Sequence, residues 1–262
     1  MLAQRVASAI VGVPLIILLI LIGGPWYAAA LAAALAVATL EFQHMRREWL
    51  DPVSILTAAL VAGIAIGAYA GRPEWLAWLA AAAVVAPRAS LTRPADNRLI
   101  DALWTLGGVT YVGFLGSFIV LLRYIDFDAR NWVLLALTST FAIDTFAFFV
   151  GRAIGRHKLA PRISPKKTIE GFVGGSAAGF AAVILCNYFF DLSVAPAQIV
   201  SLAVALPIAA TVGDLGESAL KRLTHVKDAS ELIPGHGGVL DRLDSILFTF
   251  ATVYLFTQWV VY

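Results

Sequence analysis

Long apolar runs follow one another along almost the whole chain, and they constrain the fold more than any other feature. Of the 262 residues, 60% are hydrophobic and 14% are charged, whereas a soluble domain of this length would carry about 25% charged residues. Several runs approach or exceed the roughly 18 apolar residues of a transmembrane helix. The alternating segments of about 10 residues that mark a membrane β-barrel are not found. The sequence therefore predicts an all-α fold, a polytopic transmembrane helix bundle forming one membrane domain over 1–262.

The apolar runs predict about nine spans. These are expected at 6–23, 26–42, 53–70, 74–87, 104–122, 132–150, 171–190, 197–217 and 243–261. The fourth is short, so it is expected to tilt little or to lie partly in the interface. The first is not a cleavable signal, because no small-residue cleavage site with a polar sequence follows it. Residues 131–262 are expected to carry the functional site, and 1–130 are less specific.

The basic residues predict the orientation of these spans. With the N-terminus in the cytoplasm, only three of the 19 Lys and Arg residues, Arg72, Arg123 and Arg130, fall in outer loops. Cytoplasmic loops of membrane proteins carry such an excess of Lys and Arg. The two longest cytoplasmic segments are then 151–170 and 218–242, and both are basic and contain glycine and proline. We therefore expect any chemistry to lie on the cytoplasmic side.

Carboxylates at the cytoplasmic ends of three spans are the first candidates for that chemistry, because charge at membrane depth is costly and usually functional. Asp214, Glu217, Ser218 and Lys221 are spaced to share one helical face, and Asp241, Asp244 and Ser245 repeat the spacing. Together with Asp144, two acidic faces offer the oxygen ligands that Mg²⁺ prefers. The alternative is a solvated rim in which these carboxylates pair with Arg222 and Arg242.

Basic and glycine-rich segments are the second group of candidates. Lys166 and Lys167 precede a span that Thr168 is expected to cap, and amides at a helix start bind phosphate. A basic loop can also be only a topology signal or an anionic-lipid contact. The glycines of 235–238 permit close approach of the backbone to a ligand, with His236 as a possible phosphate contact. An ordinary turn between helices has the same composition.

Small residues mark one further helix and one buried position. Gly171, Gly175 and Gly179 form a tandem GxxxG pattern, which favours close helix packing or a dimer seam. A glycine-lined wall for a lipid tail is the alternative. Cys186 is the single cysteine and lies in an apolar run, so it is expected to be a small core residue.

The combination of acidic faces, basic segments and a membrane setting indicates phosphoryl or nucleotidyl transfer to a lipid. In such chemistry the protein mainly positions groups and neutralises charge. A lipid phosphate is already anionic at neutral pH, so it needs no general base to act as a nucleophile. This fits a chain in which no obvious base is found.

Three stretches of the C-terminal half resemble the phosphatidate cytidylyltransferase family, also called CDP-diacylglycerol synthases. The main one is a long gapless pattern with Ser218, Leu220, Lys221, Arg222, Lys227, Asp228, Pro234, His236, Gly237, Gly238, Asp241, Arg242, Asp244 and Ser245. The others run from Asp144 to Arg152 and from Ser164 to Gly171, with Gly213, Asp214 and Glu217 as a further match. The first 130 residues are similar to the family in length and hydropathy but carry little that is specific.

The resemblance implies an activity, a cofactor and partners. The activity is the reaction of CTP with phosphatidate to give CDP-diacylglycerol and pyrophosphate, assisted by Mg²⁺ and by a second, monovalent cation such as K⁺. The partners are membrane lipids and a second copy of the chain in a homodimer, with no nucleic acid. The location is the bacterial inner membrane, with the active site facing the cytoplasm.

The resemblance also assigns roles to residues. Asp214 and Asp241 are the first metal ligands, and Asp244 and Asp144 come next. The catalytic set is Asp214, Asp241, Asp244, Lys221 and Arg222. The set that binds CTP phosphates or the phosphatidate headgroup is Ser164, Lys166, Lys167, Thr168, Ser218, Lys227, His236, Gly237, Gly238 and Arg242.

Three competing functions are weaker. CDP-alcohol phosphotransferases use a motif beginning Asp-Gly, and this chain contains no Asp-Gly dipeptide. A cation- or proton-coupled transporter would place its charges near the bilayer midplane, on broken helices or inverted repeats, whereas these charges gather at one face. A structural scaffold would not need the polar segment 218–245.

Overall fold

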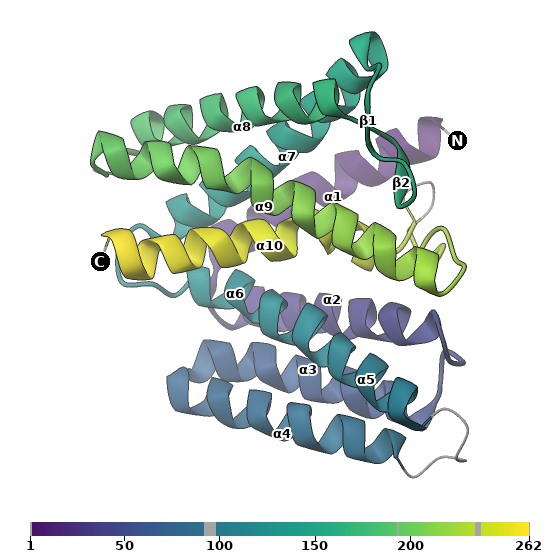
Figure 1. The fold of residues 1–262 in the computed structure, drawn as a ribbon. Helices are drawn as coiled ribbons and strands as arrows, with labels where there is room; N and C mark the ends of the chain where they lie inside the picture. Colours follow the sequence, from purple (N-terminus) through teal and green to yellow (C-terminus); the bar gives the residue numbers. More distant parts are fainter. Residues whose placement is uncertain (1, 92–97, 193, 234–236, 262) are drawn as a thin grey trace. The chain divides into compact units, whose positions relative to one another are not determined.

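The computed structural model describes residues 2–91, 98–192, 194–233 and 237–261. Its backbone is helical along most of this length, with one two-stranded hairpin (Figure 1). The chain divides into two units. The first unit contains Met1–Tyr124 and Asp228–Arg242, and the second contains Ile125–Lys227 and Leu243–Tyr262.

The first unit is built from helices that follow one another along the chain. They are α1 (Leu2–Ile22), α2 (Gly24–His44), α3 (Pro52–Ala70), α4 (Arg72–Ser90), α5 (Arg98–Gly108), the π-helix η2 (Val109–Phe114) and α6 (Leu115–Leu122). The start of α3 shows why these helices begin where they do. Asp51 accepts a hydrogen bond from Val53 N at 2.9 Å, and Pro52 at the first helical position has no N–H to satisfy.

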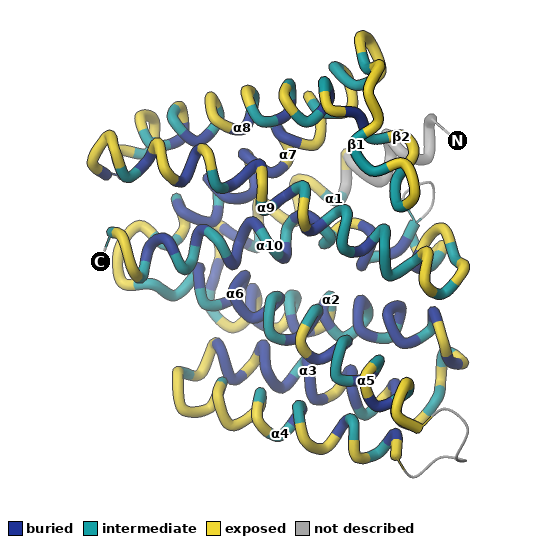
Figure 2. The backbone as a smooth tube through the Cα atoms, viewed as in Figure 1, coloured by how far each residue is buried: buried dark blue, intermediate teal, exposed yellow. Residues whose placement is uncertain are grey.

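Small residues let the helices of the first unit pack closely. A Cβ on Gly67 would lie 2.9 Å from the Trp78 ring, so α4 approaches α3 at this point. Leu60, Ile64, Ala82, Ala86 and Val109 form a core shared by α3, α4 and η2. In Figure 2 the buried residues follow the inner sides of α2 and α3, whereas α4 keeps a largely exposed outer side. An exposed apolar side of this kind suits contact with lipid.

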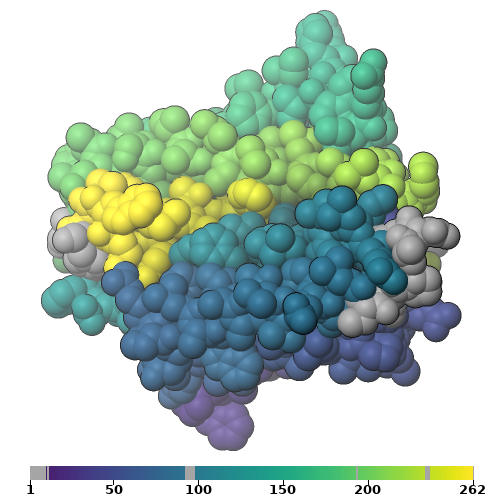
Figure 3. Space-filling model, turned by 60° about the horizontal axis from the view of Figure 1, so that its bottom comes forward, coloured from purple at the N-terminus to yellow at the C-terminus, as the bar shows by residue number. Residues whose placement is uncertain are grey.

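The second unit contains the long helices of the C-terminal half. They are α7 (Ala129–Ile154), α8 (Ile169–Phe190), α9 (Pro196–Leu223) and α10 (Leu240–Phe256), which continues into the π-helix η3 (Thr257–Val261). The first three residues of α10 belong to the first unit. Strands β1 (Lys158–Ala160) and β2 (Ser164–Thr168) pair antiparallel between α7 and α8. The end of α7 and the hairpin stand out from the surface of α8 and α9 (Figure 3).

The glycines of α8 confirm the interpretation of close helix packing. A Cβ on Gly171 or on Gly175 would lie 2.7 Å from a backbone carbonyl oxygen of α7, that of Ala147 or Ile143. A Cβ on Gly179 would overlap the side chain of Ile143. The three glycines therefore form a seam against α7 within the chain. Cys186 is buried on the same helix, as expected.

The predicted all-α membrane bundle is confirmed in outline. Each predicted range coincides with a helical segment to within a few residues. In the part of the chain that the structure describes, seven segments are long and apolar enough to cross a membrane, as in an integral membrane protein. Helices α1 and α4 are not among them, so the number of nine spans stays a prediction. The hairpin was not predicted.

Candidate active site

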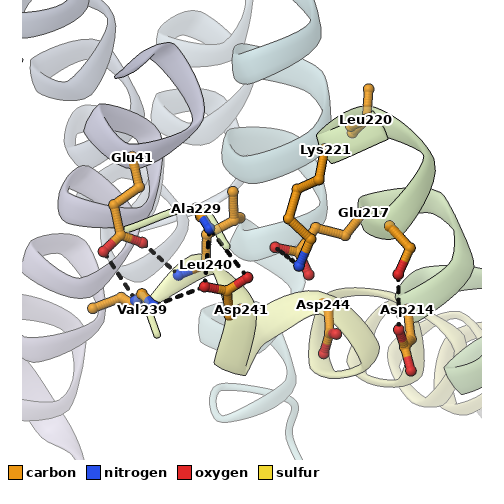
Figure 4. A network of polar contacts seen from close by, with 12 residues as sticks. Glu41, Asp214, Glu217, Leu220, Lys221, Ala229, Val239, Leu240, Asp241 and Asp244 are labelled. Atoms are coloured by element: carbon orange, nitrogen blue, oxygen red, sulfur yellow. Dashed lines mark hydrogen bonds and ion pairs between the residues drawn. The ribbon is translucent and has the colours of Figure 1, made fainter. Parts of the chain in front are cut away.

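The polar face predicted on α9 is present. Lys221 Nζ lies 3.3 Å from Glu217 Oε1, and Ser218 Oγ donates to Asp214 Oδ1 at 3.4 Å. Glu217 is fully buried, and Figure 4 shows Lys221 reaching back along the helix toward it. Since α9 runs unbroken to Leu223, residues three, four and seven apart share this face.

The β-hairpin lies against the same face of α9. Lys167 Nζ on β2 lies 2.5 Å from Asp214 Oδ2, and Arg222 Nε donates to the Ile163 carbonyl oxygen at 3.3 Å. Thr168 Oγ1 accepts from Gly171 N at 3.1 Å, which confirms the predicted cap of α8. Side chains alternate along a strand, so Lys167 is half-buried whereas Lys166 is exposed. The hairpin thus delivers one lysine to the α9 carboxylates.

Two further carboxylates come from α7 and α10. Ser245 Oγ donates to Asp144 Oδ1 at 3.5 Å, which joins α10 to α7. Asp144 interacts electrostatically with Asp244, Asp214 and Lys167. Helix α10 can approach α9 this closely because Gly213 has no side chain, and a Cβ there would overlap the Asp244 carbonyl oxygen.

The second unit therefore gathers one group of charges from four elements. We call it the acidic cluster, and it consists of Asp144, Asp214, Glu217 and Asp244 with Lys167 and Lys221. Four carboxylates face two ammonium groups, which leaves a formal surplus of two negative charges. Glu217 is fully buried, Asp214 and Asp244 are half-buried, and Asp144 is exposed. Carboxylates that lose water in this way are stabilised by neighbouring cations. The cluster is accordingly suited to take up further positive charge.

The donor set of the acidic cluster fits a hard divalent cation. Carboxylate oxygens are the ligands that Mg²⁺ and Ca²⁺ prefer, and Mg²⁺ commonly keeps several waters and substrate phosphate oxygens. Among the residues that the structure describes, no three His, Cys, Asp or Glu side chains already converge on one metal position. The cluster therefore suits a site with few protein ligands rather than a closed protein cage.

Asp241 has a different environment, in the first unit. Its Oδ2 accepts from Gly238 N at 2.7 Å and from Ala229 N at 3.1 Å. Gly237 adopts φ = +80°, and a Cβ there would lie 2.6 Å from Asp241 Oδ2. Asp241 thus joins Ala229 to Gly238 in the first unit, and the positive φ of Gly237 favours glycine there. Its predicted role as a metal ligand beside Asp214 stays a prediction.

Glu41 on α2 is a buried carboxylate of the first unit that the sequence did not single out. It is fully buried and accepts hydrogen bonds from Ser230 Oγ at 2.6 Å, Val239 N at 3.0 Å and Leu240 N at 2.7 Å (Figure 4). The available signal was a carboxylate at the end of an apolar span. Nothing in the sequence pairs it with a loop almost 200 residues away.

The remaining predicted residues differ in burial, and some lie outside the described chain. Arg222, Lys227 and Arg242 are exposed, and Ser164 is half-buried at the start of β2. His236 lies outside the described residues, as do Pro234 and Gly235. Gly238 donates its N–H to Asp241. A role in substrate binding stays a prediction for each of them.

Comparison with known proteins identifies relatives along the whole chain. The model of the cytidylyltransferase family matches residues 3–260. A phosphatidate cytidylyltransferase of Thermotoga maritima is 43% identical over 154 residues, which are 55% of each chain. One of Staphylococcus haemolyticus is 38% identical over 161 residues, which are 61% of each chain. One of Synechocystis sp. is 30% identical over 280 residues, which cover 97% of this chain and 95% of the relative. This chain thus spans less than two thirds of the first two relatives' length.

Proposed function

This chain belongs to the cytidylyltransferase family, and we propose that it acts as a phosphatidate cytidylyltransferase in phospholipid biosynthesis. It would transfer CMP from CTP to phosphatidate, giving CDP-diacylglycerol and pyrophosphate. The observation that carries this proposal is the acidic cluster, in which carboxylates and lysines from α7, β2, α9 and α10 meet. Such a mixture suits a reaction between two polyanions, which need both a cation site and direct ammonium contacts.

The reaction is an in-line displacement at phosphorus. A phosphatidate oxygen attacks the α-phosphorus of CTP, a new O–P bond forms, and the bond from the α-phosphorus to the bridging oxygen of pyrophosphate breaks. The attacking oxygen is already anionic, so no side chain has to remove a proton. The chain's own residues orient the two phosphates and offset their repulsion.

Lys167 and Lys221 are the side chains best placed to contact phosphate. Each pairs with a carboxylate of α9, at 2.5 Å for Lys167 with Asp214 and 3.3 Å for Lys221 with Glu217. These pairs hold the ammonium groups in place before substrate arrives, which lowers the ordering cost of binding. The exposed Arg222 and Lys166 on the same two elements extend the positive surface.

A divalent cation would take its few protein ligands from among Asp214, Asp144 and Asp244, with waters and substrate phosphate oxygens completing its coordination. When bound, Mg²⁺ would neutralise charge on the phosphate oxygens as it builds up in the transition state. The surplus of two negative charges in the acidic cluster supports this assignment. A role for Asp241 rests on its helical spacing with Asp244 and on the resemblance. A second, monovalent cation such as K⁺ follows from the resemblance alone.

The membrane arrangement belongs to the same proposal. Nine spans with a cytoplasmic N-terminus would put the basic segments 151–170 and 218–242 on the cytoplasmic side, where CTP is present. We propose a bacterial inner-membrane protein that works as a homodimer without a nucleic-acid partner. The excess of Lys and Arg in the inner loops supports the orientation.

The proposal is tested with the purified full chain in detergent. With CTP, phosphatidate and Mg²⁺ together, we expect pyrophosphate release and formation of CDP-diacylglycerol. Removal of Mg²⁺ with a chelator should abolish both, and omission of phosphatidate should leave only background release. Absence of phosphatidate-dependent pyrophosphate release would contradict the proposal. Ion flux into vesicles without turnover of CTP would favour the transporter instead.

A further inference from the structure

The contact between Glu41 and the loop before α10 has no role in the reaction described so far. The Glu41 side chain comes from α2, in the half of the chain with little specific sequence. Its two carboxylate oxygens accept from Ser230 Oγ, Val239 N and Leu240 N at 2.6–3.0 Å. The carboxylate is fully buried, so these donors replace the water it has lost.

Two of these donors lie at the start of a helix. The first amides of a helix have no partner within it, and α10 begins at Leu240. A carboxylate beside such amides is also stabilised by the helix dipole. Glu41 therefore caps α10 from a different helix, at a separation of 199 residues in the sequence.

Asp241 holds the same loop from the other side. It accepts from Gly238 N at 2.7 Å and from Ala229 N at 3.1 Å. The three successive amides of 238–240 thus all donate to carboxylates of the chain itself. A Cβ on Gly238 would lie 2.6 Å from Glu41 Oε2, so the residue at 238 must be glycine for the carboxylate to reach its donors.

We propose that Glu41 is a positioning residue that fixes Ser230, Val239 and Leu240, and with them the start of α10. In a glycine-rich phosphate-binding loop, backbone amides of this kind would donate to the substrate. Here the amides of Val239 and Leu240 donate to Glu41 instead. Gly237 and Gly238 accordingly leave room for the carboxylates of Asp241 and Glu41 to reach their donors. CTP phosphates are held by side chains elsewhere. The kinetic part of the test rests on the proposed function, and the structural part does not.

The test compares the wild-type chain with Glu41→Gln. Glutamine keeps the size of the side chain but turns an NH₂ group toward one of the amide donors. We expect peptides covering 229–241 to exchange their amide hydrogens about 10-fold faster or more, while peptides of α3 and α8 are unchanged. The kcat should fall by about 10- to 100-fold, while KM for CTP stays within about 2-fold.

Matched variants separate this role from a general loss of structure. Glu48→Gln removes an exposed carboxylate seven residues further along the chain, and it should alter neither exchange nor kcat. Gly238→Ala disturbs the same contact from the loop side. The double variant Glu41→Gln/Gly238→Ala should therefore be no slower than the worse single variant, because both changes break one interaction.

Several outcomes would overturn the proposal. One is normal exchange in 229–241 with kcat within 2-fold of the wild type. A second is faster exchange without any loss of kcat, since the role would then be structural only. A third is a rise in KM for CTP at unchanged kcat, because the amides would then contact substrate. If Glu41→Gln does not fold, Ser230→Ala removes one donor alone, and unchanged exchange of 229–241 in that variant would count against the proposal.

Discussion

At the residue scale, the ion pair between Lys167 and Asp214 is the contact that sets the candidate site apart from a solvated rim. It joins β2 to α9 at 2.5 Å, and neither side chain is more than about a third exposed. A rim of helix-end charges would pair with nearby arginines on its own helix. Here the partner comes from 47 residues away, on a hairpin that is also anchored by Arg222.

Replacing Lys167 tests whether this ammonium group also contacts phosphate. We expect Lys167→Met to raise KM for CTP or phosphatidate and to lower kcat/KM by about 100-fold, because a charge-assisted contact to phosphate is lost. Steady-state kinetics of pyrophosphate release measure the effect. Lys158→Met, which replaces an exposed lysine at the start of β1, is the matched control and should stay within about 2-fold. If Lys167→Met and Lys158→Met gave the same kcat/KM, the proposed contact between Lys167 and phosphate would be wrong.

The part of the site that depends on local spacing could be predicted from the sequence. The part that depends on contacts between distant residues could not. The face of Asp214, Ser218 and Lys221 follows from helical periodicity alone, and the Thr168 cap follows from one residue type before an apolar run. Glu41 could not be assigned, because two of its three donors are the backbone amides of 239 and 240, which carry no sequence signature, and the third, Ser230 Oγ, is 189 residues away. A backbone donor is visible only once the fold places it.

At the element scale, the seam between α7 and α8 determines where Asp144 lies. The glycines of α8 bring its backbone against the carbonyls of Ile143, directly before Asp144 in α7, and of Ala147, three residues after it. Helix α7 is therefore held at the level of the acidic cluster. The hairpin that follows α7 was missed because its strands are short and Pro165 disfavours a strand, although an edge strand of a two-stranded sheet tolerates it.

A substitution in this seam should cost stability. In Gly175→Ala the new methyl group would lie 2.7 Å from the Ile143 carbonyl oxygen, so α8 must shift. We expect a loss of about 1–3 kcal/mol in the free energy of unfolding, or about 2–8 °C in Tm for a chain of this size. Thermal unfolding in detergent measures it.

Gly216→Ala provides the matched control for the seam. A Cβ at this position of α9 meets nothing within 4 Å, and alanine favours a helix by about 1 kcal/mol over glycine. Its Tm should be unchanged or slightly raised. A Tm for Gly175→Ala as high as that of the control would contradict the close packing of α8 on α7.

At the scale of the whole molecule, the chain leaves the first unit after Tyr124 and returns to it for Asp228–Arg242 before α10 continues in the second. The segment with the family resemblance is therefore divided, with Asp241 in one unit and Asp244 in the other. Hydropathy predicted the helices well, because membrane spans need about 20 apolar residues each. It could not reveal this return of the chain, which depends on contacts with α2.

The proposed activity is transfer of a cytidylyl group to a lipid phosphate. In a decisive experiment the purified protein receives CTP labelled at either the α- or the γ-phosphorus, together with phosphatidate and Mg²⁺, and label is measured in the organic extract. We expect α-label to enter the lipid phase and γ-label not to, and we expect Asp214→Asn to reduce the transfer by at least about 100-fold. Transfer of γ-label to lipid, or no transfer of α-label by the wild-type protein, would contradict the proposed activity.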